Sequence, residues 1–574
     1  MDFLGLRTLT IINDAISNIK KSRGLELKIS DIPLVDELTA KMLSDGKTGA
    51  VFQMESPGMT NLVKDLQPEG FEDLIPTVAL YRPGPLGSGM VEDFIAGRHG
   101  RKITNYLHPK LEPILRETFG VILYQEQVMQ IVQTLAGFSL GQADLLRRAM
   151  SKKKAEILLA QKENFLHGCA KNGVDKILAE KIFELLSHFA DYGFNKSHSA
   201  AYALIAWQTA YLKAHFPAEY MAAIMSSVGD ADKVAAYVEL SRSMGIKVLP
   251  PDINFGDVHF SVDNGAIRFG LSAIKTVSEL TSKNILFERQ RGGKFKSIED
   301  FCARVDLNNC PRRSLEKLIK CGAFDSLDTR RTALLESLDI AILAGAKKQF
   351  NLRSGAISLF GDDEIPFKLL DVPERPKKEI LAWEKEILCF YVSGHPLDDF
   401  REKFSGLTTS TQINDGKLLG RRVKFGGIVT DVRRIMTKRG DPMAFLQLED
   451  FYGKVDVTIF TRVFNDTINV AVPDEIVVVG GKVDSKDDSI VVLADSVIAA
   501  KDYAPDFYLT LPETLDTPAT RGELKKISET NEGDRKIFVK RDGRWKKTSL
   551  KISDTPEVRA ALKNLFGEEN FCAY

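Results

Sequence analysis

The spacing of apolar residues divides the chain into regions of different texture. Between residues 11 and 230 the pattern is mostly that of helices. The run YRPGPLGSGM at 81–90 interrupts this pattern, because Pro83 and Pro85 forbid a continuous helix. Residues 231–340 predict shorter helices. The first part of the chain is therefore expected to be mostly helical.

After residue 340 the helical periodicity is lost. Residues 341–375 gather Gly, Asp and Pro, which predicts a linker or an exposed recognition segment. From residue 421 the period falls to two, and the run KVDVTIF at 454–460 places three apolar residues on one face, Val455, Val457 and Ile459. The run EIVVVGGKVDS at 475–485 follows. Several short strands in about 80 residues predict a small barrel of the oligonucleotide-binding (OB) kind.

The last part of the chain, residues 505–574, predicts a strand, a helix, a hairpin and a second helix, with Asp542 and Gly543 as the hairpin turn. A chain of 574 residues is too long for one core and is expected to form about three to five domains. The fold class is multidomain α+β. A mostly helical region precedes a small helical domain, an OB-type β-barrel and a small α/β domain.

Composition limits the kinds of binding site that are possible and indicates the cellular compartment. The chain has 78 basic and 78 acidic residues, so any site for a polyanion must be local. Six cysteines lack paired spacing, which argues against a disulfide framework or a zinc knuckle and predicts free thiols in a reducing cytosol. No stretch approaches the roughly 20 apolar residues of a membrane helix, and the N-terminus lacks a secretory pattern. We expect a cytoplasmic protein without a membrane partner.

The run DLLRRAMSKKK at 144–154 concentrates positive charge on one predicted helix. Arg148 and Lys152 stack at i,i+4, while Arg147 and Lys154 stack at i,i+7, so the charges cover two adjoining faces. A solvated helix surface is one interpretation. Paired arginines, however, have planar guanidinium groups, and each can donate two parallel hydrogen bonds, like the prongs of a fork, to phosphate oxygens. No glutamate interrupts the run. The pattern favours a phosphate-rich ligand.

A second basic cluster lies in DYGFNKSHSAAYALIAWQTAYLK at 191–213. An aromatic-glycine turn and then Asn195, Lys196, Ser197 and His198 precede an apolar helix. Polar groups at a helix N-terminus can bind an anion, since the first turn leaves free N–H groups. The alternative is helix capping by Ser197 or Ser199, which does not account for Lys196 beside His198. Arg82, before the proline-glycine turn, adds a third basic position.

Several of these runs also carry a family resemblance. The chain resembles the alpha subunit family of bacterial DNA polymerase III, the replicative DNA polymerases. The matching runs are DFLGLRTL (2–9), VFQMES (51–56), ALYRPGPL (79–86), LYQEQVM (123–129), LLRRAM (145–150), YGFNKSHSAAYAL (192–204), GAFDSL (322–327), SGHPLDDF (393–400) and GGIVTDVRRIMTKRGDPMAF (426–445). The runs are long and follow one another in order, so chance matching is very improbable.

The resemblance implies a catalytic centre that this chain holds only in part. In the family, three aspartates hold two metal ions, here expected to be Mg²⁺, which stabilise the attacking 3′-oxygen and the leaving pyrophosphate. Asp2 matches the third aspartate, and the other two belong to a motif far upstream. The chain thus resembles the C-terminal half of the enzyme. Either the chain is a fragment of a longer gene product, which we expect, or the upstream half is a separate chain. In both cases we expect this chain to be inactive alone.

The resemblance also assigns residues to the incoming dNTP. Arg147 and Arg148 match the arginine pair that meets the triphosphate, and Lys152 and Lys153 extend that surface. The other nucleotide-side motif is matched by Tyr192, Asn195, Lys196 and His198. Arg82 lies in a family motif near the same cleft. Arginines keep their protons while they neutralise phosphate charge, which suits this role.

Residues 231–340 match the family region that grips duplex DNA with helix-hairpin-helix elements. The run FGLSAIKTVSE at 269–279 matches the first, but Thr276 and Ser278 replace the usual glycines. Because non-glycine residues resist a positive φ, a phosphate contact at this hairpin is open to question. A second element contains Arg312, Arg313 and Gly322. It either contacts DNA or is only a packed helical pair. The predicted DNA-binding residues of this region are Lys275, Arg312 and Arg313.

The run AISLFG at 356–361 resembles the internal sliding-clamp motif, with Ile357, Leu359 and Phe360 as clamp-binding residues. Ala356 stands where the motif usually has glutamine. The loss of one hydrogen bond, roughly 0.5–1.5 kcal/mol, predicts weakened clamp affinity. The alternative is that this segment docks on the surface of its own chain.

The predicted barrel carries basic residues that suit a single-stranded template, namely Arg433, Arg434, Lys438 and Arg439, with Arg421 and Arg422 near its start. The alternative is a purely structural barrel. In the family the final domain can contact the clamp loader. The implied partners are thus primer-template DNA, dNTP, the sliding clamp, and the clamp loader and other replisome subunits.

The domain organisation that follows is 1–15, end of the palm; 16–230, fingers; 231–340, helix-hairpin-helix and clamp-binding region; 341–400, linker with the clamp motif; 401–503, OB-fold; and 504–574, C-terminal α/β domain. The predicted function is template-dependent DNA synthesis in chromosomal replication, by a DNA-directed DNA polymerase of which this is one part. The alternative is a non-catalytic module that binds DNA and the clamp.

Overall fold

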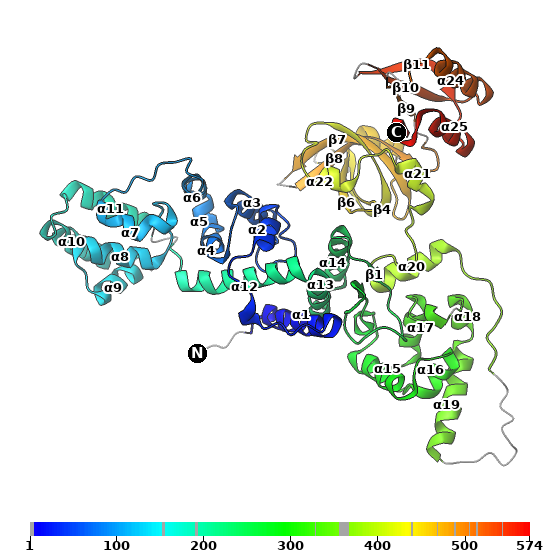
Figure 1. Ribbon diagram of the computed structural model, residues 1–574, viewed down its shortest axis with the longest axis horizontal. Helices are drawn as coiled ribbons and strands as arrows, with labels where there is room; N and C mark the ends of the chain where they lie inside the picture. The colour runs from blue at the N-terminus through cyan, green and yellow to red at the C-terminus, as the bar shows by residue number, and fades with distance from the viewer. Residues whose placement is uncertain are drawn as a thin grey trace. The chain divides into compact units, whose positions relative to one another are not determined.

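The computed structural model describes residues 5–151, 155–189, 193–327, 329–354, 367–437, 440–467, 469–486, 489–503, 506–512, 515–541 and 544–573. The chain forms two compact units, Met1–Glu374 and Arg375–Tyr574 (Figure 1). Within the described residues, no helix combines the length and the apolar character needed to cross a bilayer.

Helices form the first part of unit 1. They are α1 (Arg7–Arg23), α2 (Glu37–Ser44), α3 (Pro57–Leu66), α4 (Phe71–Leu80), α5 (Pro83–Leu86), α6 (Met90–Arg98), α7 (Glu112–Leu115), α8 (Gln125–Ala136), α9 (Leu140–Ser151), α10 (Ala155–Lys171), α11 (Lys176–Phe189), α12 (Lys196–His215), α13 (Pro217–Ser227) and α14 (Ala231–Ser243). Tyr81 and Arg82 separate α4 from α5, whose first residue is Pro83, so the predicted interruption is confirmed.

Helices α7 to α11 gather around one apolar core (Figure 1). Ile131, Leu146 and Phe165 are buried there, which fixes the direction in which α8 and α9 present their polar sides. The long helix α12 packs elsewhere in the unit, where the buried Trp207 donates its indole N–H to the carbonyl of Pro33 at 2.7 Å. The polar N-terminus of α12 therefore lies, in sequence, between the apolar core of α7 to α11 and the buried Trp207.

A small helical region ends unit 1. Strands β1 (Val248–Leu249), β2 (Ser261–Asp263) and β3 (Ala266–Arg268) form a sheet in the order β1-β3-β2. Five helices follow, α15 (Glu279–Gly292), α16 (Ile298–Arg304), α17 (Arg312–Lys320), α18 (Arg331–Glu336) and α19 (Leu338–Ser354). Gly322 lies just beyond α17 with φ of 84°, as expected for a residue that ends a helix.

Helix α19 corrects the prediction that 341–375 lacks regular structure, because residues 341–354 belong to it. This helix packs on α16 with small residues. Ala341 is fully buried, and a Cβ at Gly345 would lie 2.6 Å from the backbone of Cys302. Close helix contact made by Ala and Gly leaves no stripe of large apolar residues, so the periodicity was not visible in the sequence.

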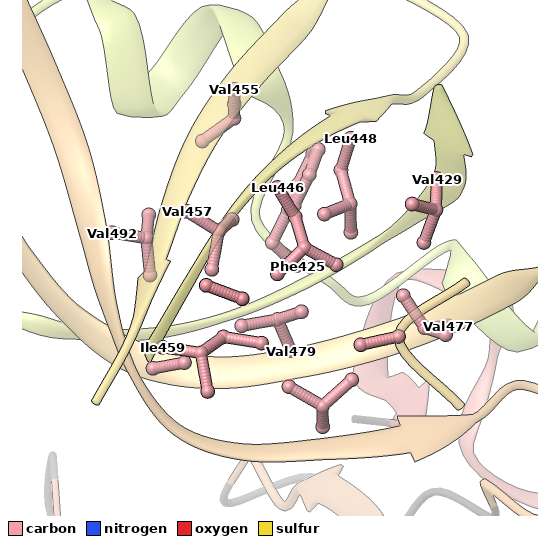
Figure 2. Packing of buried hydrophobic residues seen from close by; sticks show 14 of the residues in the cluster. Phe425, Val429, Leu446, Leu448, Val455, Val457, Ile459, Val477, Val479 and Val492 are labelled. Carbon is pink, nitrogen blue, oxygen red and sulfur yellow. The ribbon is translucent and has the colours of Figure 1, made fainter. Parts of the chain in front are cut away.

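Unit 2 begins with three helices, α20 (Lys377–Leu388), α21 (Arg401–Phe404) and α22 (Ser410–Asn414). A barrel follows, formed by β4 (Arg422–Met436), β5 (Pro442–Glu449), β6 (Lys454–Ile459), β7 (Ile476–Lys486) and β8 (Ser489–Ala499), with α23 (Thr461–Thr467) between β6 and β7. The barrel is closed in the order β4-β5-β6-β8-β7. Figure 2 shows its interior, where Val455, Val457 and Ile459 are buried, as their two-residue period predicted.

The C-terminal domain is formed by β9 (Phe507–Thr510), α24 (Pro518–Thr530), β10 (Arg535–Arg541), β11 (Arg544–Ile552), α25 (Pro556–Phe566) and β12 (Phe571–Ala573). The predicted order of strand, helix, hairpin and helix is confirmed. Strand β12 was not predicted, and it pairs with β9 to complete a sheet in the order β11-β10-β9-β12. The proposed turn residues Asp542 and Gly543 lie outside the described residues. The predicted fold class is confirmed, and the domain boundaries stay predictions.

Candidate nucleotide and nucleic-acid sites

Phe194 lies between two of the predicted basic residues. The Cζ atom of Arg82 is 4.2 Å from the centroid of the Phe194 ring, and the centroid of the His198 ring is 5.4 Å from the same centroid. Arg82 also donates from Nε to the carbonyl of Ala79, and burial lowers the pKa of its guanidinium. His198 in turn contacts Tyr202, with 4.3 Å between ring centroids. Arg82 and His198 therefore meet at one aromatic side chain.

Gln125, the first residue of α8, connects Arg147 to the same segment. Nη1 of Arg147 donates to Oε1 of Gln125 at 2.8 Å. The side-chain amide of Gln125 donates to the carbonyl of Gly193 at 3.1 Å, and its backbone N–H donates to the carbonyl of Phe194. Gln125, to which no role was assigned from the sequence, thus holds helix α9 and residues 193–194 together.

Glu126 holds the start of α12. Nδ2 of Asn195 donates to Oε1 of Glu126 at 2.9 Å, and the backbone N–H of Lys196 donates to Oε2 at 3.0 Å. Nζ of Lys196 pairs with Glu117 at 2.6 Å. Asn195 also accepts the N–H of His198, so Asn195, rather than Ser197 or Ser199, caps α12. The run LYQEQVM contained this Gln-Glu pair, but contacts across about 70 residues have no local pattern.

Asp144 pairs with both arginines of α9. It accepts from Nη2 of Arg147 at 2.8 Å and from Nε of Arg148 at 2.8 Å. The hydrogen bond from Arg147 is the largest of the effects that lower the pKa of Asp144. The run lacks glutamates, as noted from the sequence, but its first residue, Asp144, is an acidic partner for both arginines. Any anionic ligand must therefore exchange with carboxylates that already hold these cations.

The structure thus brings Arg82, Arg147, Asn195, Lys196 and His198 together around residues 193–194. Arg148 is linked to this cluster by its pair with Asp144, and its side chain is 66% exposed. Four predicted site residues, Asp2, Lys152, Lys153 and Tyr192, lie outside the described residues. Among the residues that are described, no group of three His, Cys, Asp or Glu side chains could hold a metal ion.

The first predicted helix-hairpin-helix element contains a left-handed residue although the usual glycines are absent. Thr276 adopts a φ of 73°, the conformation that a β-branched residue was expected to resist. Its carbonyl accepts a hydrogen bond from Oγ of Ser314 at 2.7 Å. Ser278 has a negative φ and caps α15 by accepting the N–H of Thr281. The hairpin keeps a left-handed residue without glycine.

The other predicted DNA-binding residues differ in their surroundings. Arg312 pairs with Asp339 at 2.6 Å and with Glu316 at 3.3 Å, while Lys275 and Arg313 are exposed. On the barrel, Arg433 and Arg434 are exposed on β4, and Arg433 lies opposite Phe445 of β5.

Arg433 and Phe445 line one groove of the barrel, together with Asp431, Gln447, Asp456 and Thr458. Lys438 and Arg439 on the barrel, and the three clamp-motif residues Ile357, Leu359 and Phe360, lie outside the described residues.

Three family models match the chain. They are described as the bacterial DNA polymerase III alpha subunit finger domain (residues 8–173), a helix-hairpin-helix motif (residues 245–334) and an OB-fold nucleic acid binding domain (residues 423–499). These matches define a protein class in which a polymerase finger domain precedes a helix-hairpin-helix motif and an OB-fold.

Curated relatives identify the family more closely. The DNA polymerase III subunit alpha of Vibrio cholerae is 45% identical over 504 residues, which cover 85% of this chain and 43% of that protein. That of Escherichia coli is 44% identical with the same coverage. That of Haemophilus influenzae is 41% identical over 598 residues, covering 99% of this chain and 52% of that protein. The chain is therefore a relative of the bacterial DNA polymerase III alpha subunit, as the sequence runs predicted.

The chain spans about half the length of these curated relatives. Among solved structures, asparaginyl-tRNA synthetase from Pyrococcus horikoshii is 14% identical, with a TM-score of 0.14 over 28% of this chain and 45% of that chain. A likeness at this level carries no argument about fold or function.

Proposed function

We propose that this chain supplies the part of a DNA-directed DNA polymerase that holds the incoming dNTP and the DNA during template-dependent synthesis. The observation that carries the proposal is the convergence of Arg82, Arg147, Lys196 and His198 around residues 193–198, within and next to the region similar to the polymerase finger domain. Relatives along most of the chain bear the name of this polymerase subunit.

In this proposal the triphosphate exchanges with carboxylates. Arg147 has a planar fork that can donate two parallel hydrogen bonds, and Asp144 now occupies part of it. A phosphate group offers more acceptor charge than one carboxylate, so it can replace Asp144 without leaving the arginine unpaired. Lys196 likewise exchanges its carboxylate partner, Glu117, for a phosphate oxygen. The acidic partners hold the cations in place until the nucleotide binds.

The metal requirement is a separate part of the proposal. Polymerase chemistry needs two Mg²⁺ ions held by several carboxylates, and these ions would supply charge stabilisation at the attacking and leaving oxygens. Asp2 is the proposed ligand in this chain. Among the described residues, no cluster of His, Cys, Asp or Glu fits such ions.

The remaining partners are proposed from the resemblance. Lys275, Arg313 and the Thr276 hairpin would contact duplex phosphates, and Arg433 and Arg434 the single-stranded template. Ile357, Leu359 and Phe360 would bind the sliding clamp, and the C-terminal domain the clamp loader. We place the protein in the cytoplasm.

Isothermal titration calorimetry with dATP tests the nucleotide site. Replacing Arg147 by alanine (Arg147→Ala) should weaken dATP binding about tenfold or more, because charge-assisted hydrogen bonds contribute about 1.5–3 kcal/mol. Arg147→Lys keeps the positive charge but lacks the planar guanidinium group. Its affinity for dATP should lie between those of the unmodified chain and Arg147→Ala.

Arg242→Ala is the matched control for that titration. Arg242 pairs with Glu239 at i,i+3 and 2.7 Å, the same arrangement as Arg147 with Asp144, but it lies on α14. This variant should bind dATP like the unmodified chain. Binding that does not depend on Arg147 would contradict the nucleotide site and favour the alternative, a non-catalytic module that binds DNA and the clamp.

A further inference from the structure

The sheet of the C-terminal domain has two faces with different surroundings. Helices α24 and α25 contribute Leu524, Leu562 and Phe566 to one core with Phe507 of β9 and Ile537 of β10. Side chains alternate between the faces of a strand. The neighbours of Phe507 and Ile537, which are Tyr508 and Phe538, therefore face away from both helices.

Tyr508 and Phe538 form an aromatic pair on that outer face. They are directly opposite each other in the parallel pairing of β9 and β10. Their rings are stacked, with 4.8 Å between centroids and 8° between planes. Neither residue is fully buried. The ring pair is thus accessible from the side of the sheet that the helices leave uncovered.

Lysines surround the ring pair on the same face. By strand alternation Lys536 and Lys540 flank Phe538 on β10, and on β11 Lys547 lies opposite Phe538 while Lys551 lies opposite Lys536. Lys536, Lys547 and Lys551 are exposed. Strands β9 to β12 contain no Asp or Glu, although the whole chain has equal numbers of basic and acidic residues.

The pairing of Lys536 with Lys551 has an energetic consequence. Like charges directly opposite each other on neighbouring strands destabilise a sheet. A bound polyanion would remove this repulsion, because its phosphates lie between the cations. The free sheet is therefore less stable than the same sheet with phosphates on this face.

We propose that the outer face of β9, β10 and β11 binds single-stranded DNA. Unpaired bases would stack against Tyr508 and Phe538, and the flanking lysines would contact the phosphates. Duplex DNA buries the faces of its bases, so the ring pair selects unpaired strands, while the lysines alone would accept either form. This surface is distinct from the barrel groove and from the finger site, and it does not depend on either.

Replacement of the ring pair tests the proposal in the full chain. We expect Tyr508→Leu together with Phe538→Leu to weaken binding of fluorescent oligo(dT) about tenfold, since stacking on an aromatic side chain contributes to each bound base. Leucine keeps apolar bulk on the sheet, so the thermal unfolding of the variant should stay close to that of the unmodified chain. Binding of duplex DNA should change much less.

A charge-matched pair of variants tests the lysines. Lys547→Gln with Lys551→Gln should reduce the salt slope of oligo(dT) binding by about 1.4, at about 0.7 for each phosphate contact. Lys525→Gln with Lys526→Gln removes the same charge from the exposed side of α24 and should leave the slope unchanged. Equal effects of the two pairs would show a general charge effect and would overturn the proposal.

Photocross-linking of oligo(dT) that contains 5-bromodeoxyuridine locates the strand directly. Adducts on peptides with Tyr508 or Phe538, found by mass spectrometry, support the proposal. Adducts confined to the barrel or to α8–α12, with unchanged affinity of the leucine variant, overturn it. If the face instead binds an acidic peptide, oligo(dT) will not cross-link there, which also overturns it. Failure here leaves the dATP experiment unaffected, so the two proposals fail separately.

Discussion

At the scale of single residues, the arginines and the lysine of the candidate nucleotide site that the structure describes each have a partner. Asp144 holds both Arg147 and Arg148, Glu117 holds Lys196, and the ring of Phe194 faces Arg82. Such pairs fix side chains at little gain in stability, because exposed ion pairs contribute little. Their effect is on geometry. A guanidinium held by a carboxylate keeps one orientation, and a phosphate that replaces the carboxylate finds the fork in place.

The buried thiols give a prediction at the same scale. Burial raises the pKa of Cys302 to about 12 and that of Cys310 to about 12. At pH 8 both should therefore resist iodoacetamide in the folded chain, because the thiolate is the reactive form. The less buried Cys389 should react first. Mass spectrometry of the alkylated peptides measures this, and equal rates for Cys302 and Cys389 would contradict it.

The same thiols affect stability at high pH. The usual thiol pKa is 9.0, so above it the unfolded chain releases protons that the folded chain keeps until about pH 12. The unfolded state then binds fewer protons, and the free energy of unfolding falls as the pH rises through this window. Cys302→Ala should reduce this fall.

At the scale of elements, two local features have tertiary causes. Thr276 keeps a left-handed conformation because Ser314, 38 residues later, hydrogen-bonds its carbonyl and the hairpin is packed between buried Ile274 and Val277. Helix α19 forms although its pattern is weak, because Gly345 allows it to approach α16 closely. In both cases packing outweighs the intrinsic preference of the residues.

The hairpin gives the prediction at this scale. Thr276→Gly should stabilise the protein by roughly 0.5–1 kcal/mol, because glycine removes a left-handed strain of about 1–3 kcal/mol and only part of this gain is lost to chain entropy. Chemical denaturation measures the change. Lys275→Gly is the control at a neighbouring position without positive φ, and it should destabilise. A destabilised Thr276→Gly variant would contradict this account of the hairpin.

At the scale of the whole molecule, the chain consists of two units with separate cores, and we propose that parts of each bind nucleic acid. Zero net charge does not prevent such binding, because the charge is distributed unevenly. Basic residues gather on α9, at the start of α12 and on β10 and β11. Local fields of this kind attract phosphates while the protein as a whole stays neutral.

Separate cores predict separate unfolding transitions. Of the three tryptophans, Trp207 lies in unit 1 and is buried, while Trp383 and Trp545 lie in unit 2. In Trp207→Phe, tryptophan fluorescence comes only from unit 2. In the double variant Trp383→Phe with Trp545→Phe, it comes only from unit 1. In urea the midpoints reported by these two variants should differ. Coincident midpoints, with circular dichroism showing one transition in the unmodified chain, would indicate one cooperative unit.

The sequence by itself determined most of the elements and the family resemblance; helix α19 and strand β12 were among the exceptions. Helix and strand periods are local properties, so the helical first half, the barrel strands and the order of the C-terminal elements could be predicted, as could the resemblance that long runs carry. Residue types also indicated that Arg147, Lys196 and His198 suit a phosphate ligand.

Only the tertiary structure decided which of these residues meet and what holds them. Gln125 and Glu126 reach residues 193–196, and the lysines of β10 and β11 share one face with Tyr508. These contacts join positions far apart in the chain, and their geometry depends on how the cores pack. A pattern of neighbours along the chain contains no information about such distances.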